Sequence, residues 1–173
     1  DNTSISNNNV WTLFEDRAGF IWIGTKSGVL NRYDPNTDRF TSWEIKSEFV
    51  KENSIKSIYE DSQGAIWIGT YKSGLYRFDP LTEKIENWCN DPLNKSSLSN
   101  NYVTSIVEDA DGNLLISTYI GLNKFNYQKS KNNFMCFYYD VNNSNTLSNN
   151  LIWALSNSKN DPNLFWIGTA DGL

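Results

Sequence analysis

The chain has 173 residues, a formal net charge of −5 and a sequence pI of about 4.7. It contains no basic run, which excludes nucleic acid as an expected partner, and no apolar stretch near the ~20 residues that a membrane helix needs. It contains no histidine, so Ser-His-Asp and Cys-His catalysis and most transition-metal sites are excluded. The two cysteines lack a Cys-x-x-Cys spacing, and we expect neither a zinc site nor any cofactor.

The first unit of the chain, at approximately residues 10–45, predicts four short strands separated by turns. Residues 10–14 alternate between two sides of a strand, and Asp16 and Gly19 supply turn chemistry after it. The apolar run at 20–25 is typical of a strand buried on both faces. Two further strands complete the unit, at residues 29–34 and 39–45.

The same pattern recurs in three more units, at approximately residues 55–90, 103–140 and 152–173, of which the last is incomplete. The units align at four equivalent positions, spaced 45 to 51 residues apart: Gly24, Gly69, Ser117 and Gly168. Four short antiparallel strands in a repeat of ~40–50 residues are typical of a propeller blade, whereas the coils of a parallel β-helix, the alternative, are usually shorter. We therefore predict an all-β fold, a β-propeller fragment of about three and a half four-stranded antiparallel blades, which forms one partial propeller over residues 1–173.

Tryptophans recur in the apolar strand of three units, at Trp22, Trp67 and Trp166. We expect these large side chains to pack between neighbouring blades. In the third unit Leu115 takes the equivalent position, so the interface there should be smaller.

Acidic residues recur at the first turn of three units, at Asp16, Asp61 and Asp109. A single carboxylate in each of three separate turns does not supply the converging oxygen ligands of a calcium site, so we expect these residues to cap turns. Each follows a glutamate, and neighbouring residues of a strand point to opposite faces, unlike the two carboxyl groups ~5–10 Å apart that glycosidases use. We therefore predict scaffold roles for these pairs, with no catalytic and no metal-binding residue in the chain.

Positions that vary between the units are the better candidates for ligand binding. Near the start of the first strand the equivalent residues are Trp11, Lys56, Thr104 and Trp153, and after the second strand they are Lys26, Tyr71, Tyr119 and Ala170. In a propeller these positions surround a channel opening, where aromatic rings can stack on sugars and lysines can bind hydroxyl or carboxylate groups. The predicted ligand-binding residues are Trp11, Lys26, Lys56, Tyr71, Tyr119 and Trp153, and the alternative is ordinary surface variation.

Several motifs of the chain together resemble the two-component regulator propeller repeat. They are the Glu-Asp-x-x-Gly turn, the Ile-Trp-Ile-Gly-Thr strand, the Gly-Leu-x-Arg-Phe-Asp strand, and the Leu-Ser-Asn-Asn element at residues 98–101 and 147–150. This resemblance implies the periplasmic sensor region of a hybrid two-component system, which recognises glycan-derived oligosaccharides and signals to a histidine kinase. It implies that the chain is not an enzyme, and that kinase activity and membrane attachment lie in segments outside it. A protein-interaction scaffold and a propeller lyase or glycosidase are the alternative functions.

An incomplete ring of blades has open strand edges and an uncovered blade face. Such edges and faces favour pairing with another chain. We therefore expect the chain to self-associate, in addition to binding an oligosaccharide.

Overall fold

The computed structural model describes residues 3–47, 50, 53–158, 160–161 and 163–173, and this part of the chain forms strands and turns without a helix. The first sheet contains β1 (Val10–Glu15), β2 (Ile21–Thr25), β3 (Val29–Asp34) and β4 (Arg39–Glu44). The second contains β5 (Ile55–Glu60), β6 (Ile66–Thr70), β7 (Leu75–Phe78) and β8 (Ile85–Trp88). The third contains β9 (Val103–Glu108), β10 (Leu114–Thr118), β11 (Leu122–Phe125) and β12 (Phe134–Phe137). A hairpin of β13 (Ile152–Asn157) and β14 (Phe165–Thr169) follows.

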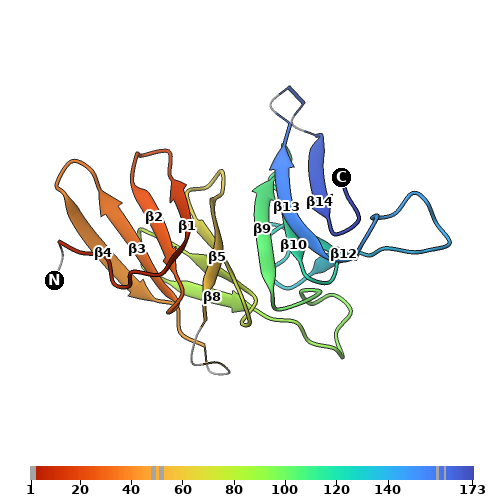
Figure 1. The fold of residues 1–173 in the computed structure, drawn as a ribbon, viewed down its shortest axis with the longest axis horizontal. Helices are drawn as coiled ribbons and strands as arrows, with labels where there is room; N and C mark the ends of the chain where they lie inside the picture. The colour runs from red at the N-terminus through yellow and green to blue at the C-terminus, as the bar shows by residue number, and fades with distance from the viewer. Residues whose placement is uncertain (1–2, 48–49, 51–52, 159, 162) are drawn as a thin grey trace.

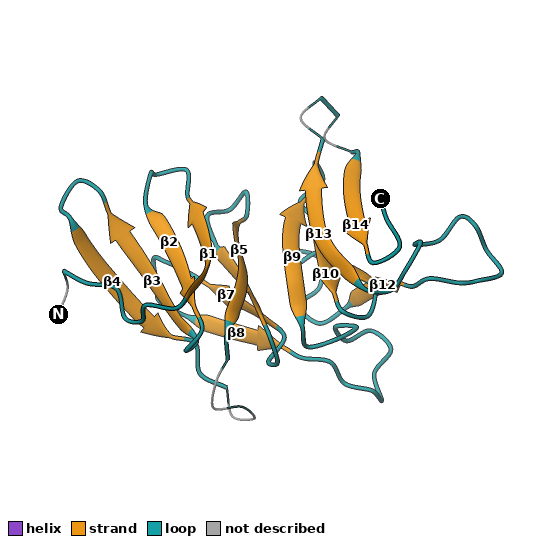
Figure 2. Cartoon of the chain, in the orientation of Figure 1, coloured by secondary structure: helices purple, strands orange, loops and turns teal. Residues whose placement is uncertain are grey.

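Each sheet is an antiparallel meander whose strands pair in sequence order. The first strands of successive sheets lie next to one another, because β1 contacts β5, β5 contacts β9, and β9 contacts β13. The sheets therefore stand face to face around one side, as blades do in a propeller (Figures 1 and 2). This arrangement confirms the predicted all-β propeller fold.

The second strand of each complete blade is buried, as its apolar sequence predicts. All residues of β6 and β10 are buried, and in β2 only Ile21 is partly exposed. Each of these strands pairs with two neighbours within its sheet. β6 and β10 lie in sheets that have a neighbouring blade on both faces, whereas β2 has the second blade on one face. Burial of their branched and aromatic side chains is the main source of stability in such a fold.

Tryptophans fill the first two blade interfaces, as expected from the repeat. Trp22 stacks on Trp43 of its own blade, with ring centroids 5.7 Å apart, and meets Phe78 of the next blade edge-on at 5.8 Å. Trp67 packs in the same way on Trp88 and on Phe125 of the third blade. Both tryptophans are almost completely buried, with exposed fractions of 1% and 0%.

Two glycines allow the blades to approach closely at their inner strands. A Cβ atom on Gly24 would lie 2.5 Å from Cγ2 of Ile55, which belongs to the next blade. A Cβ atom on Gly69 would lie 2.5 Å from Cγ1 of Val103, again in the next blade. Real Cβ atoms do not pack so closely, so the packing of adjacent blades requires a residue without a side chain here.

The repeated aspartates close the first turn of each blade. Asp61 accepts hydrogen bonds from the backbone N–H groups of Gln63 and Ala65, and its second oxygen accepts one of 2.7 Å from Nε1 of Trp67. Asp16 makes the same bonds in the first blade, including one of 2.7 Å from Nε1 of Trp22. These carboxylates therefore cap turns, and each also fixes the indole that fills the blade interface.

In the third blade the turn aspartate has different hydrogen-bond partners, because Leu115 has no indole N–H group. There the carboxylate of Asp109 accepts hydrogen bonds from the side-chain amide of Asn113 and forms an ion pair of 2.9 Å with Lys124. The replacement of tryptophan by leucine is thus accompanied by two polar residues that take over the free carboxylate oxygen.

The glutamates that precede these aspartates connect neighbouring blades. Glu60 accepts hydrogen bonds from the backbone N–H group of Arg17, at 2.9 Å, and from its guanidinium, at 3.0 Å. Glu108 accepts hydrogen bonds from the backbone N–H group and the hydroxyl of Ser62 in the same way. The two carboxylates of a Glu-Asp pair thus serve different interactions, which supports the predicted scaffold role.

Candidate functional site

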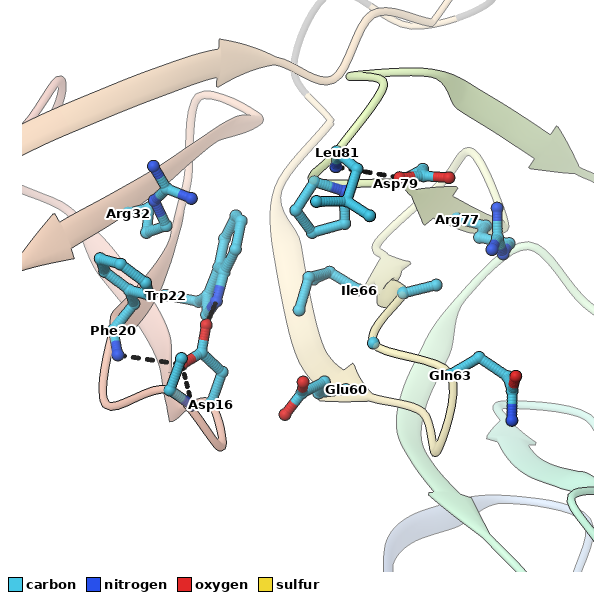
Figure 3. A pocket seen from close by; sticks show the side chains of 14 residues that line it. Asp16, Phe20, Trp22, Arg32, Glu60, Gln63, Ile66, Arg77, Asp79 and Leu81 are labelled. Carbon is cyan, nitrogen blue, oxygen red and sulfur yellow. Dashed lines mark hydrogen bonds between the residues drawn. The ribbon is translucent and has the colours of Figure 1, made fainter.

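At the end of the molecule that carries the Asp16 turn, a cavity of about 360 Å³ lies between the first two blades. Asp16, Trp22 and Arg32 of the first blade line one side, and Glu60 and Asp79 belong to the other blade (Figure 3). A second cavity of about 360 Å³ lies at the next interface, and the equivalent residues Asp61, Trp67 and Glu108 line it. Because both cavities are built from the same repeat positions, they follow from the packing of the blades, and we assign no ligand to them.

The opposite end of the blades carries the predicted binding residues, and each first strand has a β-bulge there. The pairing register shifts by one residue in all four blades, between Val10 and Thr12 in β1 and at the same point in β5, β9 and β13. The extra residues are Trp11, Lys56, Thr104 and Trp153. A bulge re-aims a side chain relative to the regular alternation of a strand, so the unbroken alternation expected for residues 10–14 is wrong at this position.

Beside the bulge, the residue that follows the second strand lies next to the residue that precedes the first strand. The residue after the second strand donates its backbone N–H group to the carbonyl of the residue before the first strand. These bonds measure 2.9 to 3.1 Å and join Lys26 to Asn9, Tyr71 to Ser54, Tyr119 to Tyr102, and Ala170 to Leu151. Each blade therefore presents three variable side chains at one end of its inner strands.

A row of aromatic rings runs across the blades at this end. Tyr71 of the second blade meets Tyr102 edge-on, with ring centroids 4.5 Å apart. The rings of Tyr102 and Tyr119 lie 3.7 Å apart, and Tyr119 meets Trp153 of the fourth blade at 5.4 Å. These contacts connect three blades, and they hold the rings in fixed mutual orientations.

The ammonium group of Lys56 lies at the other end of this row. Its Nζ is 3.1 Å from the ring centroid of Trp11 and 5.6 Å from that of Tyr71, distances at which a cation is attracted to an aromatic face. Burial lowers the pKa of Lys56 below its ordinary value. Lys72 lies 5.1 Å from the ring centroid of Tyr71, so a second cation faces the same ring.

These side chains surround a pocket of about 380 Å³. Its lining residues are Trp11, Lys26, Ser54, Lys56, Tyr71, Lys72, Tyr102 and Tyr119. We call these residues, together with Trp153, the aromatic–lysine face. Aromatic rings that can stack on a ligand and ammonium and hydroxyl groups that can form hydrogen bonds therefore meet in one pocket.

The structure brings all six predicted binding residues together. Trp11, Lys26, Lys56, Tyr71 and Tyr119 line the pocket, and Trp153 adjoins it through its contact with Tyr119. Thr104, the equivalent of Lys56 in the third blade, does not take part. Its hydroxyl donates a hydrogen bond of 2.8 Å to the carbonyl of Ile152 and thus lies between blades.

Sequence reasoning missed three residues of this face, Ser54, Lys72 and Tyr102. Tyr102 contacts both Tyr71 and Tyr119, so it connects the ring of the second blade to the rest of the row. Burial raises its pKa, and a hydrogen bond with Tyr119 adds to the effect. The signal for it was present, because the position before the first strand varies between units as the other two positions do.

The described residues also bear on metal sites and on membrane-spanning helices. Among these residues, no cluster of three or more histidine, cysteine, aspartate or glutamate side chains is suited to hold a metal ion. The described part of the chain also contains no helix of the length and apolar character that crossing a membrane requires.

A family model, described as the two-component regulator propeller, matches residues 4–27, 50–72 and 97–119. Three segments of the chain thus match the two-component regulator propeller repeat. Each matched segment ends one to two residues after the second strand of a blade, so the three copies correspond to the first three blades. No curated protein sequence matches the chain significantly.

Solved structures with such blades resemble the chain. One is the extracellular domain assigned to the hybrid two component system BT4673 from B. thetaiotaomicron, with a TM-score of 0.81 and 25% identity over 97% of this chain and 21% of that one. The corresponding domain of BT3049 from the same organism gives 0.75 and 24%, over 95% of this chain and 22% of that one. The propeller repeats described here thus span about a fifth of those extracellular domains.

A third structure shares the fold alone. It is the catalytically inactive virginiamycin B lyase from Staphylococcus aureus, crystallised with quinupristin. The TM-score is 0.72 and the identity 13%, over 97% of this chain and 52% of the lyase. At this identity the likeness concerns the propeller architecture of the repeats and not the reaction.

Proposed function

We propose that the chain is a ligand-sensing propeller segment in the periplasmic region of a hybrid two-component system. Its propeller repeats and its likeness to the extracellular domain of BT4673 support this assignment. Binding of a ligand would change the geometry of the sensor and thereby regulate a kinase that lies outside these residues.

We further propose that the aromatic–lysine face contacts a glycan-derived oligosaccharide. The observation that carries this proposal is the continuous row of rings from Tyr71 through Tyr102 and Tyr119 to Trp153, flanked by Lys56 on Trp11. The apolar face of a pyranose ring stacks on an aromatic side chain, and several rings in a row match several sugar units. Trp11 and Trp153 are both about half exposed, so they are available for such contacts.

The chain is proposed to bind its ligand without turning it over. The carboxylates nearest to a catalytic pattern, Glu60 and Asp61, already bind Arg17 and Trp67 in the scaffold. None of the described residues that line the aromatic–lysine face carries a carboxylate, whereas a glycosidase places two carboxyl groups in its site. Any kinase activity belongs to other parts of the full-length protein.

A thermal-shift screen of the chain against oligosaccharides from many glycans tests this function. A specific ligand at about 100 times its Kd should stabilise the fold by about 2.7 kcal/mol. We expect Trp11→Ala and Trp153→Ala to abolish the shift, whereas Tyr139→Ala, which removes an exposed ring outside the face, should retain it.

The ligand recovered after the screen distinguishes the alternatives. Intact ligand supports the sensor, and cleaved ligand would show that the chain is an enzyme. A shift that survives both tryptophan substitutions would place binding elsewhere, and the absence of any shift would contradict the assignment of an oligosaccharide site to this face.

A further inference from the structure

We infer that the ligand of the aromatic–lysine face is an acidic oligosaccharide, whose carboxylate or sulfate group binds beside Lys56. This inference rests on the proposed function and specifies its ligand class. It follows from the charge of the pocket, the position of Lys56 and the hydrogen-bonding groups that the pocket lacks.

The pocket concentrates positive charge in an acidic protein. Lys26, Lys56 and Lys72 line it, and among the described residues no aspartate or glutamate does, although the chain has a net charge of −5. The two cavities at the opposite end of the blades have mixed linings, in which carboxylates lie among cations such as Arg32 and Lys129. The positive charge is therefore a local property of this face.

The three lysines have no anionic partner in the described part of the chain. The ion pairs found there involve other cations, namely Arg17, Lys46, Arg77, Lys84 and Lys124. An ammonium group that is partly withdrawn from water without a counter-ion gains the most from a bound anion.

Lys56 is the residue best placed to bind that anion. It occupies the bulge of β5, and one side of its ammonium group rests on the ring of Trp11. The ring attracts the cation electrostatically, and the N–H donors on the side of the ammonium group away from the ring remain available for an acceptor. A sugar that stacks on the neighbouring rings would bring an acidic substituent at its edge toward these donors.

The pocket lacks the groups that would favour a neutral glycan. Neutral sugars are usually fixed by carboxylate or amide side chains, which accept hydrogen bonds from adjacent hydroxyl groups. In the part of the chain that the structure describes, no aspartate, glutamate, asparagine or glutamine lines this pocket, although asparagine is abundant in the chain. The side chains present are ammonium donors, hydroxyl groups and an indole, which suit an acceptor on the ligand.

Isothermal titration calorimetry with three panels of oligosaccharides tests the inference. The first contains uronates, namely oligogalacturonates, alginate oligosaccharides and glucuronoxylo-oligosaccharides, and the second contains sulfated chondroitin and heparin oligosaccharides. The third contains neutral xylo-, arabino-, manno- and malto-oligosaccharides. We expect binding from the first or second panel, and the responding panel tells whether the anion is a carboxylate or a sulfate.

Two measurements then test the role of the charge. For a uronate ligand the methyl ester, and for a sulfated one the desulfated sugar, should bind at least about ten-fold more weakly, with the protein unchanged. Lys56→Met should weaken the acidic ligand by about ten-fold, whereas Lys95→Met, an exposed lysine outside the face, should have no effect. Affinity should also fall as salt is added, since salt screens the attraction.

Binding of neutral oligosaccharides with equal or higher affinity than the acidic ones would overturn this inference and leave the proposed function standing. Equal affinity for the acid and its neutral derivative would overturn it as well. Failure of all three panels would contradict the oligosaccharide site itself, and with it this inference.

Discussion

At the residue scale, the repeated aspartate and the tryptophan six positions after it act as one unit. The carboxylate of Asp61 holds both the turn and the indole of Trp67, so the conformation of the turn and the packing of the blade interface are coupled. Where Leu115 replaces tryptophan, Lys124 and Asn113 bind the carboxylate of Asp109 in its place. A charge-assisted hydrogen bond that is largely withdrawn from water is stronger than a neutral one, which accounts for the short distances.

The raised pKa of Tyr102 predicts that the stability of the folded protein depends on pH. Burial raises the pKa of its phenol in the folded protein above the unfolded value of about 10. A raised folded pKa means that the stabilisation is fully present below pH ~10 and is lost as pH rises through the folded pKa. We expect the melting temperature to fall above pH ~10, and to fall less in Tyr102→Phe than in the wild type.

Thermal melts from pH 8 to 11.5 check this expectation. Tyr139→Phe is the matched control, because it removes a hydroxyl from an exposed ring outside the row. Parallel curves for the wild type and Tyr102→Phe would show that the folded structure does not disfavour ionisation of this phenol.

At the element scale, the bulge in the first strand of each of the first two blades lies beside the position where neighbouring blades are closest. The bulge directs one side chain to the end of the blades, and in these two blades the glycine opposite, Gly24 or Gly69, lets the next blade approach. In β1 and β2 the register joins Thr12 to Gly24, and Trp11 is the extra residue beside this pair. The same backbone irregularity that positions the candidate site therefore lies at the closest contact between blades.

Substitution of these glycines tests the closeness of the blades. Gly69→Ala would place a methyl group 2.5 Å from Cγ1 of Val103 and 2.2 Å from Oγ of Ser57, so the second and third blades must separate. We expect a loss of about 1–3 kcal/mol in the free energy of unfolding, as for other overpacked cores. Chemical denaturation of the variant measures the loss.

Gly168→Ala is the control at the equivalent position of the last hairpin. There the nearest atom to the new methyl group lies 3.8 Å away, in ordinary contact, and we expect no loss of stability. Equal stabilities of the two variants would mean that adjacent blades can separate at this point without cost.

The blades could be predicted from the sequence because each repeat contains its strands and turns in the same order. The alignment of four equivalent positions shows where each repeat begins: Gly24, Gly69, Ser117 and Gly168. Most residues of the aromatic–lysine face could also be predicted, because variation at fixed repeat positions can be seen in the sequence alone. The bulges were not predicted, since a single extra residue changes the register without requiring a particular residue type. Tyr102 was missed because it precedes its strand, and the variation of that position between units does not by itself show that the loop reaches the face. The backbone hydrogen bond from Tyr119 and the ring contacts with Tyr71 and Tyr119 show it.

At the scale of the whole molecule, neighbouring blades stabilise one another. The exposure of the tryptophan at the same repeat position therefore depends on whether a following blade covers it. Trp22 and Trp67 are buried by the blade that follows, whereas Trp166, at the equivalent position of β14, is 49% exposed. Its neighbours Phe165 and Ile167 pack against the third blade, so the tryptophan faces the uncovered side of the hairpin. β14 is also an edge strand in the described structure, because it pairs with β13 alone apart from an isolated bridge.

This uncovered face leads us to propose that the 173-residue chain self-associates. An exposed indole beside unpaired backbone groups provides both apolar area and strand pairing to a second copy. Light scattering across micromolar concentrations should show a mass that rises with concentration, and Trp166→Lys should shift the chain toward the monomer. The control is Leu93→Lys, which places the same charge at an apolar residue exposed in a loop. A wild-type chain that stays monomeric at all concentrations would contradict self-association through Trp166. Association that is equally weakened by both substitutions would show that net charge, rather than this face, controls it.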